Sequence, residues 1–203
     1  MITGLYEEIR PTLSSGQRRE LAIGEDGVLL TQNVQESDGG GLFQSLSFNR
    51  PSDTTPYTIN DRIGPTTDNT GVTPIQGVEL TRADGRPSLL VRCRIAIQKV
   101  DFLPTLRVHF YNSGAPSGTA LVGDNAAFVR TFNNLPNRIG SITLPTLTAE
   151  SDHAVAMTSE LSFVLYPASG SRLIYPVLQI VAGTSITPSS AMPVRVDFWT
   201  VEI

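Results

Sequence analysis

Two stretches in which apolar and polar residues alternate constrain this chain more than any other feature of its sequence. They cover residues 89–100 and 106–111, and residues 101–104 (DFLP) join them. A side-chain period of two over this length is typical of β-strands with one buried and one wetter face. The pattern therefore predicts a fold built on antiparallel sheet. The residues expected to face the core are Leu89, Val91, Cys93, Ile95, Ile97, Leu106, Val108 and Phe110.

Turn signals recur about every ten residues from Tyr57 onward, which is the rhythm of a β-sandwich. The pair Asp84-Gly85 predicts a tight hairpin over residues 82–87, and Asp124 is placed to cap one helical turn over residues 125–128. We expect roughly nine strands and very little helix. The other strands are predicted at residues 27–34, 75–81, 139–144, 153–158, 161–166, 172–181 and 194–201.

The first 55 residues differ from the rest of the chain. They combine a weak helical spacing over residues 4–10 with a polar, glycine-rich break at 35–41, and they offer few apolar partners of their own. Such a segment either packs on something else or is a disordered tail. We therefore predict an extended N-terminal arm over residues 1–55 and a β-sandwich domain over residues 56–203. The residues expected to form a protein interface are Leu5, Tyr6, Ile9, Leu13, Leu42 and Phe43.

The charge pattern argues against a nucleic-acid partner. The net charge is −4, and the basic residues are scattered rather than clustered. Binding to DNA or RNA needs a concentrated positive field, which these residues do not form. Charged residues make up 17% of the chain, below the roughly 25% of average proteins. This low fraction suits either a surface partly covered by other subunits or a secreted β protein.

The single cysteine, Cys93, excludes an intrachain disulfide, and its place in the alternation predicts a buried small hydrophobe rather than a reactive thiol. The N-terminus has no basic segment followed by an apolar stretch, as a secretory signal would. No apolar run approaches the ~20 residues that span a bilayer. We expect a soluble protein that is made in the cytoplasm and has no membrane partner.

No arrangement of residues in the sequence indicates catalysis. His109 and His153 lie on separate predicted strands without further ligands at a zinc spacing, and a zinc site needs three or four nitrogen or sulfur ligands. No Gly-x-Ser-x-Gly motif sets up a serine nucleophile, and most aspartates lie in turns. We predict no enzyme, no cofactor and no metal site. The sequence leaves open whether distant strands bring together a glycosidase-like pair of carboxylates.

Two aromatic residues, Tyr111 and Trp199, fall on the polar side of their predicted strands. An aromatic side chain on that face can bind sugar, fill a subunit interface or cover a second layer of the sandwich. The alternation alone leaves these three interpretations open.

A series of short motifs resembles a family of tailed-bacteriophage virion proteins of the podophage and siphophage kind. The most specific piece runs from Phe110-Tyr-Asn112 to the DNAAF motif at residues 124–128, and weaker pieces lie at 57–64 (YTINDRIG), 139–140 and 173–177 (LIYPV). The resemblance covers about residues 57–203. It implies an all-β, antiparallel, jelly-roll-like sandwich docked on the phage head, and it carries over no catalytic residues.

The resemblance implies a capsid decoration or cement protein that binds the major capsid protein and stabilises the head. We expect a homotrimer on the head surface of the virion. An alternative is a receptor- or glycan-binding domain of a tail fibre or spike, which exposed clustered aromatics in loops would favour. A third hypothesis is an esterase or glycosidase sandwich, which paired carboxylates in a cleft would favour.

Overall fold

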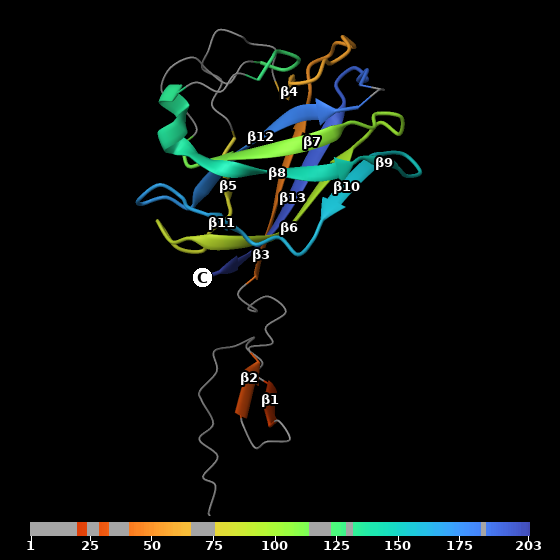
Figure 1. Ribbon diagram of the computed structural model, residues 1–203. Helices are drawn as coiled ribbons and strands as arrows, with labels where there is room; N and C mark the ends of the chain where they lie inside the picture. Colours follow the sequence, from red (N-terminus) through yellow and green to blue (C-terminus); the bar gives the residue numbers. More distant parts are fainter. Residues whose placement is uncertain are drawn as a thin grey trace, which may run out of the picture. The chain divides into compact units, whose positions relative to one another are not determined.

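The computed structural model describes residues 20–23, 29–32, 41–65, 76–113, 123–128, 132–183 and 186–203. The chain divides into two compact units, Met1–Gly40 and Gly41–Ile203. In the first unit, β1 (Glu20–Ile23) and β2 (Leu29–Gln32) form an antiparallel pair (Figure 1). The second unit contains all the other described strands, and the rest of the description concerns this unit.

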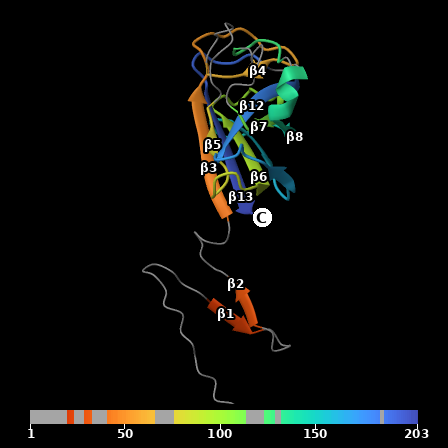
Figure 2. The same ribbon diagram turned by 90° about the vertical axis from the view of Figure 1, so that its left-hand side faces the viewer.

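Two antiparallel sheets build the second unit (Figures 1 and 2). Sheet I has the order β3–β13–β6–β10–β9, and β11 also pairs with β6. Sheet II has the order β4–β12–β7–β8, and β5 also pairs with β12. The strands of sheet I are β3 (Gly41–Asn49), β6 (Ser88–Ile97), β9 (Thr148–Ala149), β10 (Ala154–Thr158), β11 (Phe163–Leu165) and β13 (Pro193–Glu202). The strands of sheet II are β4 (Arg62–Ile63), β5 (Val78–Glu79), β7 (Thr105–Tyr111), β8 (Arg138–Thr146) and β12 (Leu173–Ala182).

The core lies between the two sheets because their inward faces are apolar. Ile95 of β6 and Val108 of β7 are fully buried in one cluster. The ring of Phe110 in β7 meets that of Phe198 in β13 edge-on, with 6.0 Å between centroids. The predicted antiparallel all-β class is therefore confirmed. The predicted core positions that are fully buried are Cys93, Ile95, Ile97, Leu106, Val108 and Phe110.

A β-bulge in β6 makes part of the predicted alternation wrong. Thr200 of β13 pairs with Leu90, where an unbroken register would pair it with Val91. The extra residue shifts the inward and outward positions by one. Leu90 is consequently fully buried, while Leu89 and Val91, which we predicted to face the core, are only half-buried.

The turn at Asp84 and Gly85 joins the two sheets instead of forming the predicted hairpin. Gly85 has the positive φ of 71° that a tight turn can require. The strand predicted at 75–81 is reduced to β5, which pairs with β12 in sheet II, whereas β6 on the other side of the turn belongs to sheet I. A hairpin-type turn sequence therefore serves here as a crossover between layers.

The first strand of sheet I changes the division that the sequence suggested. Residues 41–55 were predicted as part of the arm, but β3 pairs with β13 from Gly41 to Asn49. The boundary between the two compact units accordingly falls between Gly40 and Gly41 in the sequence. The helical spacing predicted over residues 4–10 lies outside the described residues, and the strand predicted at 27–34 contains β2.

Helix plays a minor part in the described structure. The predicted helical turn after Asp124 is instead a turn that ends in a bridge between Asp61 and Ala127. One short 3₁₀ helix, η1 (Phe132–Asn137), precedes β8. Of the helical residues that the structure describes, none form a helix long and apolar enough to cross a membrane.

Candidate protein interface on the outer face of sheet I

The register of β3, β13 and β6 arranges their outward side chains in rows. Residues opposite each other in antiparallel strands point to the same face, with their Cβ atoms about 5 Å apart. Because inward positions of these strands fill the core, the alternate positions form the outer face of sheet I. Two neighbouring rows across this face are Ser45–Asp197–Arg94 and Phe43–Trp199–Arg92.

Asp197 is the centre of the first row, and polar side chains cover it. Its Oδ1 accepts hydrogen bonds from the Ser45 hydroxyl at 2.5 Å and from Arg195 Nε at 2.8 Å. Its Oδ2 accepts one from Arg94 Nε at 2.8 Å. The Asp197 side chain is only 1% exposed, whereas those of Arg94 and Arg195 are 40% and 51% exposed. The arginines therefore connect a buried carboxylate to the surface.

The donors around Asp197 favour its ionised form. Desolvation by burial raises the pKa of this carboxyl, but the hydrogen bonds from Ser45, Arg195 and Arg94 together outweigh burial. The pKa of Asp197 therefore lies below its ordinary value. At neutral pH the carboxylate is charged and holds both guanidinium groups in place.

An aromatic pair continues this face along the strands. The rings of Phe43 and Trp199 lie 4.9 Å apart between centroids, and Phe43 is 47% exposed. The guanidinium carbons of Arg92 and Arg94 lie 5.4 Å and 5.7 Å from the centre of the Trp199 ring, within cation–π range. We call the set Phe43, Arg92, Arg94, Arg195, Asp197 and Trp199 the arginine–aromatic face.

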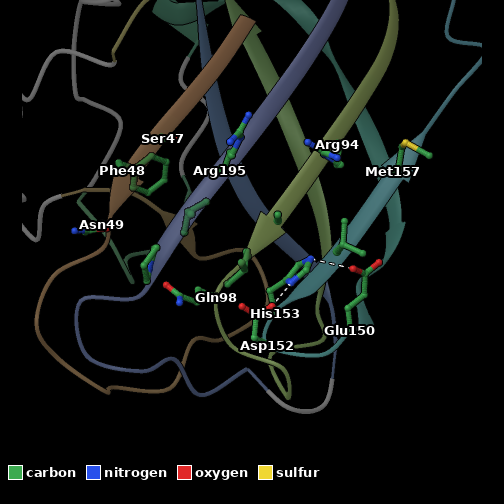
Figure 3. A pocket seen from close by; sticks show the side chains of 15 residues that line it. Ser47, Phe48, Asn49, Arg94, Gln98, Glu150, Asp152, His153, Met157 and Arg195 are labelled. Atoms are coloured by element: carbon green, nitrogen blue, oxygen red, sulfur yellow. Dashed lines mark hydrogen bonds and ion pairs between the residues drawn. The ribbon is translucent and has the colours of Figure 1, made fainter.

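A cleft of about 980 Å³ opens beside Arg94 of the first row and Arg195, which lies opposite Ser47. Figure 3 shows Arg195 and Arg94 on neighbouring strands, with Met157 on the strand beyond and His153 near the end of the cleft. Met157 is 50% exposed. The residues that line the cleft are Ser47, Phe48, Asn49, Arg94, Ala96, Ile97, Gln98, Glu150, Asp152, His153, Val155, Met157, Pro193, Val194 and Arg195.

A second hollow of about 600 Å³ lies at the other row. Trp199, Arg92 and Val91 line it from sheet I, and the connection from β10 to β11 supplies residues 159–162. Both residues at the bulge, Val91 and Arg92, thus contribute to the same hollow. The two hollows flank the arginine–aromatic face, so the face has relief into which side chains of a partner can fit.

His153 forms a small ion cluster at the rim of the cleft (Figure 3). Its Nδ1 lies 2.7 Å from Asp152 Oδ1, and its Nε2 lies 3.1 Å from Glu150 Oε2. The hydrogen bond from His153 is the main reason why the pKa of Asp152 lies below its ordinary value. A general acid of a glycosidase needs a raised pKa instead, so Asp152 is not poised for that role.

The predicted interface residues divide between described and undescribed parts of the chain. Leu5, Tyr6, Ile9 and Leu13 lie outside the described residues. Leu42 and Phe43 lie on β3, where only Phe43 is on the outer face and Leu42 is half-buried.

The arginines and Asp197 are interface candidates that our sequence reasoning missed. They alternate with the core residues of β6 and β13, so the period of two could have identified them. Trp199 was correctly placed on this polar side. Only the long-range pairing of β3 with β13 brings Phe43 to it.

Tyr111, the other aromatic residue predicted on a polar face, is packed beneath a second layer of residues. It is buried with Phe128 and Val177 on the outer side of sheet II. The neighbouring His109 is also fully buried: its Nε2 lies 2.8 Å from Gln179 Oε1, and its ring stacks on the Phe128 ring at 4.4 Å. Sheet II is thus covered at this end by the loop that contains Phe128.

A second buried carboxylate, that of Asp124, lies inside the domain and is surrounded by hydrogen-bond donors. This residue accepts hydrogen bonds from Arg50 Nη2 at 2.6 Å, from the Tyr57 hydroxyl at 2.6 Å and from the Gly64 amide at 2.9 Å. The side chains of Arg50 and Asp124 are both 0% exposed. Asp124 is therefore a tertiary link between distant loops, and not the helix cap that we predicted.

Burial has the largest effect on the pKa values of the side chains in this inner cluster. It raises the pKa of Asp124 above its ordinary value, and the hydrogen bonds from Tyr57, Gly64 and Arg50 offset only part of the effect. Burial likewise raises the pKa of the Tyr57 phenol, so its hydroxyl keeps the proton that it donates to Asp124. These side chains are enclosed and present nothing to a partner.

Comparison with known proteins assigns no family to this chain: no protein-family model and no curated protein matches its sequence. Within the described ranges, no group of three or more histidine, cysteine, aspartate or glutamate side chains is placed to hold a metal ion. The candidate site of this domain is therefore the arginine–aromatic face with its two hollows.

Proposed function

We propose that this protein is a structural protein of a tailed-phage virion, a capsid decoration or cement protein that binds the major capsid protein lattice and stabilises the head. The observation that carries the proposal is the arginine–aromatic face. Arginine, tryptophan and phenylalanine are enriched at protein interfaces, and here they lie side by side on one face of a sheet. The motif resemblance over residues 57–203 supports the same function.

The proposed fold is a jelly roll with an extended N-terminal arm. Its support is the nested pairing of strands in the second unit: β3 with β13, β4 and β5 with β12, β6 with β10 and β11, and β7 with β8. A long hairpin wrapped into two sheets pairs its strands in this order, and capsid and lectin domains use such double-sheet folds. Because fold alone does not define function, the proposed function rests on the residues at the surface.

The proposed mechanism is additive binding energy. Each copy bridges neighbouring capsid subunits, so separating these subunits must also break the contacts of the decoration protein. A protein that binds the assembled lattice but not free subunits stabilises the lattice by mass action. A homotrimer at a three-fold position of the head engages three weak contacts at once, which gives avidity without one tight interface.

Particles that lack the protein test the proposal directly. They should release DNA at a lower temperature, or at a smaller osmotic shock, than complete particles, and purified protein added back should restore the difference. Adsorption to host cells should be unchanged. Heads with unchanged stability but lost adsorption would contradict the proposal and would move the protein to the tail.

A receptor- or glycan-binding domain of a tail fibre or spike is the second candidate. The observation that favours it is the open cleft, where Asn49 and Gln98 offer amide groups beside charged side chains (Figure 3). Amide and charged groups in a concave site can orient a polar ligand. The same adsorption measurement separates this candidate from the head protein, because only a receptor-binding domain is needed for attachment.

A further inference from the structure

Positive charges outnumber negative charges on the arginine–aromatic face. Over residues 92–97 of β6 and 195–199 of β13, the outward charged side chains are Arg92, Arg94, Arg195 and Asp197. Asp197 is covered by the arginines, so an approaching surface meets guanidinium groups first. The nearby acidic groups lie at the rims: Glu150 and Asp152 contact His153, and Glu160 lines the hollow beside Trp199. The centre of the face is therefore positive although the whole chain carries −4.

Two of these arginines keep donors available for a partner. A guanidinium group has five N–H donors in a fixed fork. Arg94 gives its Nε and Nη2 to Asp197, while Arg195 gives its Nε to Asp197 and its Nη2 to Ser45. Each is thus anchored by two donors, and its remaining N–H groups are on a side chain that lines the cleft. A fork held in this way loses little conformational entropy when it binds a carboxylate.

Apolar groups lie directly beside these donors. Phe43 and Met157 are 47% and 50% exposed, and Trp199 is packed between Phe43 and two arginines. Aromatic and arginine side chains that are already ordered are the usual anchors of a binding interface. The face therefore combines a site for a carboxylate with a site for an apolar side chain.

We infer that the arginine–aromatic face docks an acidic segment of the major capsid protein. A carboxylate of that segment binds Arg94 and Arg195 in the cleft, and an adjacent apolar side chain packs against Phe43 and Trp199. The inference rests on the proposed function and names the surface and the partner chemistry for it. Charge complementarity selects this occupant over a neutral glycan, which would leave the guanidinium groups without a counter-charge.

Binding of the full-length protein to heads that lack it tests the inference. Dissociation constants from co-sedimentation are compared for the wild type, for Arg94→Ala with Arg195→Ala, and for Arg107→Ala. Arg107 is a matched control because it lies on β7 of sheet II and donates from Nε to a neighbouring strand residue, Thr143. The double variant should bind at least about thirtyfold more weakly, and the control should stay within about twofold of the wild type.

A second variant and a competitor keep the test independent of folding. Phe43→Ala leaves every hydrogen bond of Asp197 in place, and it should weaken binding about tenfold. Polyglutamate should displace the wild-type protein from heads, and an uncharged polymer of similar length should not. Salt should weaken wild-type binding more than binding of the double arginine variant, because exposed charge pairs are screened.

The outcomes separate the inference from the proposed function. A wild-type protein that does not bind heads overturns both. A wild type that binds, together with arginine and Phe43 variants that bind equally well, overturns the inference and leaves the function standing. Self-association that these variants abolish while head binding persists would make the face a contact between copies, and that also overturns the inference.

Discussion

Asp124 and Asp197 are both buried carboxylates that accept hydrogen bonds from arginine, but their arginines lie in different surroundings. Arg50, which binds Asp124, is as buried as its partner, with both side chains 0% exposed. Arg94 and Arg195, which bind Asp197, are 40% and 51% exposed. The first arrangement ties loops together inside the domain. The second uses the carboxylate as a support that presents two guanidinium groups at the surface.

The pKa values of the two aspartates are also shifted in opposite directions. The pKa of Asp124 lies above its ordinary value because burial dominates, and the pKa of Asp197 lies below because its donors outweigh burial. A buried ion pair contributes little net stability compared with well-packed apolar residues, yet removing one partner is costly. A carboxylate's own burial therefore does not reveal its role, whereas the exposure of its partners does.

The largest effect should come from Asp124→Ala. This change leaves the Arg50 guanidinium buried beside Tyr57 without its carboxylate, and it should lower the free energy of unfolding by about 3–5 kcal/mol. Urea denaturation at neutral pH measures the loss. Asp53→Ala serves as the control, because Asp53 also contacts Arg50 but is 34% exposed, and its removal should cost under about 1 kcal/mol. Equal costs for the two variants would contradict the distinction between inner and outer partners.

A smaller effect on stability should come from Asp197→Ala. Its arginines can turn to water once the carboxylate is gone, so the free energy of unfolding should fall by about 1.5–3 kcal/mol, the scale of hydrogen bonds to a charged group. Binding to heads should weaken as well, because Arg94 and Arg195 lose the support that orders them. The same denaturation and co-sedimentation measurements check both results. A stability loss as large as that of Asp124→Ala would place Asp197 among the structural links.

The smallest effect should appear in the dependence of stability on pH. Asp197 has a lowered folded-state pKa, so its contribution is present above the unfolded value of about 3.9 and is lost as pH falls through the folded-state pKa. The stability difference between wild type and Asp197→Asn should therefore shrink on acidification. Asp124 has a raised pKa, so its ionisation should cost stability as pH rises from the unfolded to the folded value. Denaturation of wild type and both asparagine variants between pH 7 and pH 3 measures these trends, and parallel curves would refute them.

Side-chain alternation made much of the strand content predictable. The strands predicted at 139–144 and 194–201 lie within β8 and β13, and the strand predicted at 172–181 overlaps β12 from Leu173 onward. Alternation reports which face a residue takes, but it holds no information about which strand lies alongside. β6 and β7 follow each other in the chain and belong to different sheets, whereas β3 pairs with β13 at the far end of the sequence. The bulge at Val91 was hidden for a related reason, because it exists only against its partner strand.

The site was predictable to the extent that it depends on one strand at a time. The outward positions of Arg94, Arg195 and Trp199 follow from the period of two along β6 and β13. Their assembly with Phe43 depends on tertiary pairing. Asp124 shows the same limit, since local rules suggested a helix cap while its partners Arg50 and Tyr57 lie 74 and 67 residues away in sequence.

The single cysteine gives this molecule a built-in reporter of its own opening. Cys93 is fully buried opposite Phe198, and burial raises the pKa of its thiol, so the folded protein should resist thiol reagents. Reagents attack the thiolate, which forms readily only when the two sheets separate at the core that contains Cys93. The labelling rate therefore measures the free energy of that separation under native conditions. A particle that binds the folded protein should slow labelling by the factor 1 + [L]/Kd, so one sulfur atom can report docking in the unaltered chain.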